Sequence, residues 1–415
     1  LDQVVAGGSN LLVAVLAART LGPSGFGLFS IAFTVYVTAQ GASRAMVGEP
    51  LLIHPKEIEE RTGEAIASGV VLGVAFALVV AAGAALTSIW SSGLAWSLLV
   101  LAVAMPALVL QDQGRYLGFA LQRPVLSLVL DSVWLVLMIA ALAVLFVLDH
   151  RGLVWFVAAW AGSGAVSGLL VFGQHVATHS LRSMRPRLAW LRETWSYAWR
   201  YLAAFSVAQI GALGTSIGLV SVIGTRGLGG VQGAILLTRP TLTVQAASVA
   251  AGVAEVARTE DADQFRRHVR RTTSFTVVAA LLNGIVLLLL PGPVGRFVLG
   301  DTWAVAKPLL LPAVIQLVLL TCNSGAKAGL LGRKGVGTVV WIEAIGTTTA
   351  VSAAIVGGVM NGALGAMWGR ALAWIAILAL WWVVFRMHGR RSAVTIAGAE
   401  GPRHDAAPID EPGVP

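Results

Sequence analysis

Two stripes of polar side chains interrupt otherwise apolar stretches of the sequence. Within each stripe the residues are four or seven positions apart, so on a helix they share one face. The stripes consist of Tyr36, Gln40 and Arg44, and of Gln232, Arg239 and Thr243. The planar guanidinium of arginine pairs bidentately with phosphate groups. Two cationic stripes that face one cleft therefore predict a binding site for a phosphate-bearing substrate.

The arginines at membrane depth differ in how strongly they indicate function. A charged side chain inside a bilayer is costly unless it faces a cavity or a partner. Arg239 is near mid-span, which favours a cavity role, and Pro240 is expected to kink its helix and free a backbone carbonyl. For Arg44, substrate binding and snorkelling to nearby headgroups are equally supported. For Arg370, pairing with an acid is the favoured alternative.

Two acidic residues, Asp131 and Glu343, occupy nearly equivalent places in the two halves of the chain. A carboxylate at membrane depth can titrate and couple transport to protons. A structural role is favoured, because each acid is near a helix end, where it can reach Arg123 or Arg333 or cap a helix. Uncharged polar residues that either line the cleft or bridge helices are Asn10, Gln209, Gln316 and Asn323.

The elements that must position these residues are membrane-spanning helices. The 415-residue chain is 57% hydrophobic and only 12% charged, which excludes a water-soluble fold. Apolar runs of the length that crosses a bilayer recur from end to end. With about 20 residues per span, helices are expected at 3–20, 28–50, 65–88, 93–112, 125–148, 152–174, 201–223, 229–252, 273–291, 305–325, 337–358 and 362–385.

The distribution of basic residues predicts the topology. Alternate connections between the expected helices carry most of the 29 basic residues, and cytoplasmic loops collect such residues. These connections hold Lys56 and Arg61, Arg115 and Arg123, Arg182 to Arg200, Arg258 to Arg271, and Lys327 to Lys334. Both termini are therefore expected in the cytoplasm. The net charge of +9 reflects this topology, and we expect no nucleic-acid partner.

Two short sequence repeats divide the chain into halves. The pattern Arg-x-Leu-Gly at 19–22, followed by Gly27, returns at 226–229, followed by Gly233. A Gly-x3-Gly pair followed by arginine, at 114–123, returns at 325–333. Repeats of six helices each are a common plan of transporters. The expected domains are an N-terminal six-helix bundle (1–180), a cytoplasmic amphipathic linker (181–200), a C-terminal six-helix bundle (201–385) and a disordered cytoplasmic tail (386–415).

Signatures of cofactor, metal and enzyme sites are missing from the sequence. Cys322 is the single cysteine, so no disulfide or cysteine-based metal site is expected. No Gly-rich phosphate loop follows a strand, and no paired acids occur in an external loop. We expect no cofactor, no metal and no catalytic residue. No cleavable signal peptide is predicted, since the first apolar segment lacks a basic leader and a cleavage site.

The segment at 18–29, ARTLGPSGFGLF, follows a first helix that contains Asn10. It resembles the turn "AR-x-LGP-x-x-FG" that joins the first two helices of bacterial polysaccharide flippases, which belong to the multidrug/oligosaccharidyl-lipid/polysaccharide exporter superfamily. The resemblance implies an all-α membrane protein of about twelve helices, in two six-helix bundles that face a V-shaped central cleft (MATE-like). The chain departs from the family where an acidic "DLG" step is replaced by Gln40-Gly41-Ala42-Ser43-Arg44.

The resemblance also implies a function, which is the flipping of polyprenyl-pyrophosphate-linked oligosaccharide across the bacterial inner membrane for cell-surface polysaccharide synthesis. Arg44 and Arg239 are expected to hold the pyrophosphate. Membrane lipid, a polysaccharide polymerase and glycosyltransferases are the further candidate partners. The alternative within the fold is a cation-coupled multidrug or metabolite exporter, which requires carboxylates in the cleft. A membrane enzyme requires a larger external loop than the sequence offers, and a scaffold without transport does not require polar stripes.

Overall fold

The computed structural model describes residues 2–48, 51, 58–178, 188–259, 261–333 and 335–399. All regular structure in these ranges is helical. The first half contains α1 (Asp2–Thr20), α2 (Gly22–Ser43), the π-helical turn η1 (Arg44–Gly48), α4 (Ile58–Thr87), α5 (Ser92–Ala120), α6 (Pro124–Val147) and α7 (Leu153–Thr178). The second half contains α8 (Leu188–Ala257), α9 (Ala262–Leu288), α10 (Gly292–Leu299), α11 (Thr302–Ala306), the 3-10 turn η4 (Lys307–Leu309), α12 (Leu310–Thr321), α13 (Ser324–Gly332) and α14 (Val336–Ala399).

Two of the long helices fold back on themselves. In α8, Gly224 leaves the helical conformation with φ of 70°, and Gln232 beyond it lies beside Ser216 before it. In α14 the same happens at Asn361 and Gly362, where a Cβ on Gly357 would overlap the backbone of Gly365. Only glycine takes a positive φ without strain, which explains the sharp reversals at Gly224 and Gly362.

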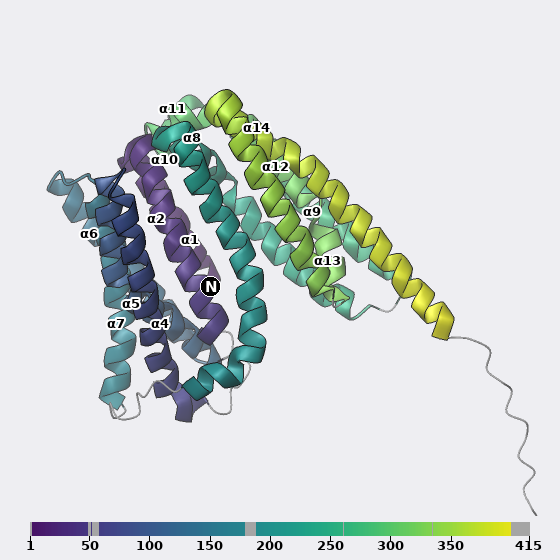
Figure 1. Ribbon diagram of the computed structural model, residues 1–415, viewed down its shortest axis with the longest axis horizontal. Helices are drawn as coiled ribbons and strands as arrows, with labels where there is room; N and C mark the ends of the chain where they lie inside the picture. Colours follow the sequence, from purple (N-terminus) through teal and green to yellow (C-terminus); the bar gives the residue numbers. More distant parts are fainter. Residues whose placement is uncertain are drawn as a thin grey trace, which may run out of the picture.

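Twelve membrane passes result from this arrangement. Nine segments of the described chain are long and apolar enough to cross a bilayer, and the two that fold back supply two passes each. The remaining pass is α1, whose 19 residues pack against α2 and α6. The predicted all-α membrane fold of about twelve helices is confirmed. We call the end of the molecule at which α4 begins and α5 ends the basic end, and the end at which α8 and α14 turn back the opposite end (Figure 1).

Several predicted boundaries were wrong. The fourth predicted helix ended at residue 112, but α5 continues to Ala120 and buries Arg115, which had been assigned to a loop. The continuation is possible because acidic partners compensate the charge of Arg115. Inside the predicted loop near residue 291, α10 forms a short helix of eight residues. Lys327 also lies in a helix, α13, and not in a loop.

The predicted linker and tail are partly described. Residues 188–200 of the linker are helical and run without a break into the rest of α8, with Trp195 and Trp199 both exposed. Residues 181–187 lie outside the described residues. The helix α14 extends to Ala399, past residue 386, where the predicted tail begins. The predicted disordered cytoplasmic tail stays a prediction. Residues 400–415 lie outside the described residues.

The first repeated motif packs the two halves together at the opposite end. Gly27 of α2 and Gly229 of α8 face one another so closely that a Cβ on either would overlap the other helix, at the carbonyl oxygen of Thr225 or of Pro23. Nearby, the Thr302 hydroxyl donates a 2.7 Å hydrogen bond to the Ala18 carbonyl. One glycine from each copy of the motif, Gly27 and Gly229, thus forms a tight helix crossing.

Helices of the two halves lie on either side of this crossing (Figure 1). In the view shown, α4 to α7 form one group, and α9 and α12 to α14 form another, with α1, α2 and α8 between them. The apolar core runs through both halves, with Phe29 and Trp160 in the first and Leu228 and Trp303 in the second. This arrangement leaves internal space between α2, α8, α12 and α14.

Candidate functional site

A central cavity of about 380 Å³ lies mainly within the second half of the molecule. Its walls come from α8, α12 and α14, and α2 closes it from the first half with Phe33, Thr34 and Val37. The cavity therefore belongs mainly to the second half and is closed on one side by a helix of the first half.

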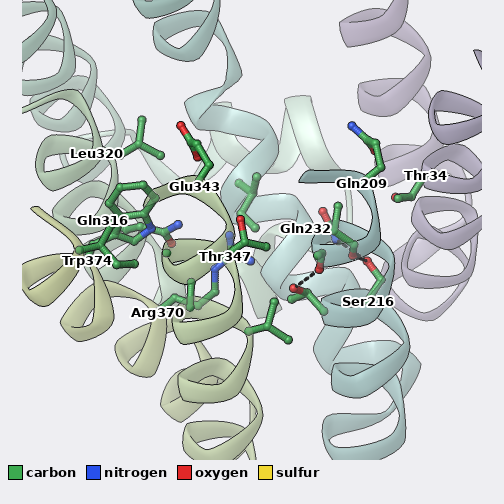
Figure 2. Close-up of a pocket in the computed structure, with 18 of the residues that line it drawn as sticks. Thr34, Gln209, Ser216, Gln232, Gln316, Leu320, Glu343, Thr347, Arg370 and Trp374 are labelled. Carbon is green, nitrogen blue, oxygen red and sulfur yellow. Dashed lines mark hydrogen bonds between the residues drawn. The ribbon is translucent and has the colours of Figure 1, made fainter. Parts of the chain in front are cut away.

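Polar side chains line much of this cavity. Figure 2 shows Gln209 and Gln232 on one side of it and Gln316 and Arg370 on the other. The Gln232 amide nitrogen lies 3.5 Å from the hydroxyl of Ser216, across the two arms of α8. Amides and hydroxyls that converge on one space can bind the hydroxyl groups of a polar ligand.

The cavity carries two arginines without an acidic partner among the described residues. The Arg239 guanidinium lies 5.6 Å from the centre of the Phe33 ring, which is a cation–π contact. The Nε atom of Arg370 is buried and has no hydrogen-bond partner in the described part of the chain. Arg370 therefore does not show the acidic partner that the sequence favoured. Arg370 nevertheless lines the cavity, so its guanidinium adds positive charge there.

Glu343 is the single acid among the described residues that line the cavity, and it is already paired. The ammonium group of Lys327 lies 2.7 Å from a Glu343 carboxylate oxygen, and both side chains are about one-third exposed (34% and 37%). The pair has no net charge, so the two arginines determine the charge of the cavity. A cationic cavity of this kind favours an anionic ligand.

A second space, the side groove, continues from the central cavity and has a volume of about 640 Å³. The two spaces share Leu320, Glu343 and Trp374. Most of its wall is aliphatic, with leucine, valine and alanine side chains from α8. Asn323 and Gln245 add polar groups, and Gln245 donates to the Leu320 carbonyl and the Ser324 hydroxyl. A mainly apolar groove thus opens beside the cationic cavity.

In the first half, acids neutralise Arg44 and Arg115. Arg44 makes a two-pronged ion pair with Asp112, at 2.6 and 2.7 Å, and donates a further bond of 3.3 Å to Gln40. Arg115 lies 3.5 Å from Asp112 and 3.1 Å from Asp131. Two arginines and two aspartates therefore form one network without net charge. Its carboxylates are almost fully buried, at 1% and 5% exposure.

A small polar cavity of about 30 Å³ lies next to this network. Asn10, Tyr36, Gln40 and Asp131 line it, and the Tyr36 ring packs edge-on against Trp160 at 4.9 Å. Its volume is enough for about one water molecule. A phosphate-bearing substrate does not fit there.

The structure separates the two predicted stripes. Tyr36, Gln40 and Arg44 face the interior of the first half, so the prediction that they face a shared cleft with the second stripe was wrong. The reason is the buried Asp112, which attracts Arg44 away from the cleft. Of the second stripe, Gln232 and Arg239 line the central cavity.

The structure also differs from the sequence predictions for Thr243 and Pro240 of α8 and for the partners of the two acids. Thr243 is exposed, donates to the Arg239 carbonyl at 3.2 Å and lines neither space. Pro240 does not interrupt α8, in which Gly224 is the non-helical residue of the described segment. Asp131 pairs with Arg115 and Glu343 with Lys327, and not with the predicted Arg123 and Arg333. The predicted coupling role of these acids stays a prediction.

Neither a protein-family model nor a curated protein sequence matches the chain. Solved structures do resemble it. A multidrug-resistance MATE family transporter of the MOP superfamily, in an inward-facing conformation, superposes with a TM-score of 0.75 at 14% identity, over 95% of this chain and 96% of that one. The fold is that of the MOP-superfamily transporters. The lipid II flippase MurJ, in an inward closed conformation, matches with a TM-score of 0.69 at 12% identity, over 93% of this chain and 86% of that one.

The conformation is also indicated by comparison. An outward-facing structure of a MATE family transporter matches with a lower TM-score of 0.62 at 14% identity, over 93% of this chain and 92% of that one. The chain therefore superposes better on the inward-facing structure than on the outward-facing one. Close contacts between Gly27 and Gly229 and between Thr302 and Ala18 hold the two halves together at the opposite end.

Proposed function

We propose that this protein is a membrane transporter that moves an anionic amphipathic substrate, a lipid-linked oligosaccharide pyrophosphate, across the bacterial inner membrane. The observation that carries the proposal is the pair of arginines, Arg239 and Arg370, that line the central cavity without an acidic partner among the described residues. Leaving two cations uncompensated at membrane depth is costly unless a ligand supplies the opposite charge. A pyrophosphate supplies it, with oxygens that match the planar guanidinium groups.

The two connected spaces support a substrate with two chemically different parts. The central cavity offers amide and hydroxyl groups for sugar hydroxyls, beside the arginines that bind phosphate. The side groove offers an aliphatic wall for the hydrocarbon chain of the carrier lipid. In this proposal Arg370 has the phosphate-binding role that the sequence analysis assigned to Arg44, because the Arg44 guanidinium is already paired with Asp112.

Transport by alternating access follows from the fold and the closed opposite end. We infer that the excess of basic residues places the basic end and both termini in the cytoplasm. The cavity then receives substrate from the cytoplasmic leaflet. Glycosyltransferases supply such a substrate, and a polysaccharide polymerase consumes it on the other side.

The test is a flipping assay with the full-length protein in proteoliposomes. The probe is a fluorescent polyprenyl-pyrophosphate oligosaccharide, and the measured quantity is the rate at which it reaches the other leaflet. Each charge-assisted bond to phosphate is worth about 1.5–3 kcal/mol, so Arg239→Gln and Arg370→Gln should each slow flipping about tenfold or more. Arg296→Gln is the matched control, since that arginine is exposed and lines neither space.

Two results would overturn the proposal. Full flipping by both cavity variants at normal protein levels removes the substrate role of the arginines. Transport of a cationic dye, with no flipping of the pyrophosphate probe, establishes the exporter alternative instead. In cells, deletion of the gene should trap the lipid-linked intermediate on the cytoplasmic side and abolish the surface polymer.

A further inference from the structure

A pocket of about 280 Å³ lies at the basic end between α9 and α14. It shares no lining residue with the central cavity or the side groove. Arg266, Arg270 and Ser274 line it from α9, and Trp382 and Phe385 line it from α14. The α9 residues are four apart, so they form one face of that helix. The pocket therefore combines two cations with an aromatic wall.

The aromatic wall is held in place by several contacts. Phe265 stacks on Phe385, with ring centres 5.9 Å apart, and Arg333 lies 4.0 Å from the centre of the Phe265 ring. The indole N–H of Trp382 donates a 3.2 Å hydrogen bond to the Cys322 carbonyl. These rings are fixed before any ligand arrives, so binding costs little side-chain ordering.

The second repeated motif builds this wall. Gly329, the second glycine of that motif, lies directly against the rings, and a Cβ there would come within 2.6 Å of the Phe385 ring. Gly325, the first glycine, lets α13 approach the backbone of α9 at Val269. Arg333, which ends the motif, covers Phe265. The transport function proposed above does not use any of these residues.

The pocket lies where α9 passes from water into the membrane. Ahead of Ser274, the last α9 residue that lines the pocket, α9 carries exposed cations, among them Arg266 and Arg270. After Ser274 the exposed face of α9 becomes apolar, with Phe275 at 58%, Val278 at 53% and Leu282 at 60% exposure. Such a change along one helix marks the level of the lipid headgroups. Basic pockets between transmembrane helices at this level suit anionic headgroups.

We propose that this pocket binds an anionic phospholipid, with the headgroup phosphate on Arg266 and Arg270 and an acyl chain along Ser274, Trp382 and Phe385. Arg270 has no ion pair among the described residues. Arg266 gives one nitrogen to Asp263, at 2.6 Å, and keeps its other donors. The lipid joins α9 to α14 and offsets the repulsion among the arginines of α9.

The experiment is native mass spectrometry of the full-length protein with added lipid. Phosphatidylglycerol and phosphatidylcholine with the same acyl chains are titrated separately, and the apparent affinity of retained lipid is measured. An arginine near an anionic surface contributes on the order of 1 kcal/mol, so the double variant Arg266→Gln/Arg270→Gln should bind phosphatidylglycerol at least about tenfold more weakly. Ser274→Trp fills the pocket, leaves the arginines in place and should weaken binding as well.

The matched control is Arg267→Gln/Arg271→Gln. It makes the same change of charge on the same helix at two exposed positions that do not line the pocket. Unchanged binding in this control, with loss in the pocket variants, supports the site. Equal loss in both double variants means that general charge attracts the lipid, and this overturns the proposal. Equal retention of phosphatidylcholine, or displacement of the lipid by inorganic phosphate alone, also overturns it.

Discussion

The two halves of this protein repeat one ion pair but differ in the charge that surrounds it. Arg115 and Asp131 of the first half correspond to Lys327 and Glu343 of the second, and both partners are displaced by the same number of residues along the chain. The same displacement relates Asp112 to Ser324, which is neutral. Asp112 pairs with two arginines in the first half, whereas Arg239 and Arg370 of the second half have no acidic partner among the described residues. The two halves therefore differ in whether acids neutralise the arginines in their interior.

The largest expected effect tests the network of the first half. Asp112→Asn removes a buried partner of two arginines, so the free energy of unfolding should fall by about 3 kcal/mol. Chemical unfolding in detergent measures it. Asp149→Asn is the control, because Asp149 is 81% exposed and pairs with the exposed Arg151. Equal losses in the two variants would show that burial of the network contributes nothing.

The next prediction concerns the crossing where the halves meet. Gly229→Ala places a Cβ against the Pro23 carbonyl, so α2 and α8 must separate, at a cost of about 2 kcal/mol in the free energy of unfolding. Gly214→Ala lies on the same helix with no atom near its Cβ. That control should gain up to about 1 kcal/mol from helix propensity. A lower free energy of unfolding for Gly229→Ala together with a higher one for Gly214→Ala supports the close crossing. A higher free energy of unfolding for both variants contradicts it.

The third prediction concerns the cavity of the second half. Arg370→Gln removes a cation whose Nε has no hydrogen-bond partner among the described residues, so the protein should be more stable by about 1 kcal/mol, although flipping falls. Thermal unfolding and the flipping assay on the same preparation measure the two effects. A loss of stability as large as that of Asp112→Asn would mean that Arg370 has an acidic partner.

The fourth prediction compares the two repeated ion pairs directly. Lys327 and Glu343 are 34% and 37% exposed, whereas Arg115 and Asp131 are 9% and 5% exposed. A double-mutant cycle should therefore give a coupling energy of about 0.5 kcal/mol for the exposed pair, and a larger one for the buried pair. Equal coupling energies would mean that the difference in solvent exposure does not change the strength of the two ion pairs.

The smallest effect is a pH dependence at a helix start outside the membrane. Backbone N–H groups of Asp263 and Gln264 donate to the Asp261 carboxylate and lower its pKa. The ionised cap therefore stabilises the start of α9 above the ordinary pKa of aspartate, and this is lost as pH falls through the lowered value. Hydrogen exchange of these two amides should quicken in that range. In the first half Ser91 caps α5 without a titrating group, so the Leu94 amide should show no such change.

The sequence determined the class of the protein, because hydropathy and the bias of basic residues are local properties. The apolar runs, the glycine motif at Gly27 and Gly229 and the equivalence of Asp131 and Glu343 could all be recognised without a structure. The polar run Gln111-Asp112-Gln113 in an apolar stretch was a further signal of a buried network. The sequence prediction missed it by ending that helix at residue 112.

Only the tertiary structure decided which arginines are free. The neutralisation of Arg44 depends on α5 lying beside α2 and η1, which brings together Arg44 and Asp112 from distant parts of the chain. Helical periodicity places Arg44 and Arg239 on similar stripes, but it contains no information on what each stripe faces. Charge compensation acts over a few ångströms in space, whereas a sequence pattern records only separation along the chain.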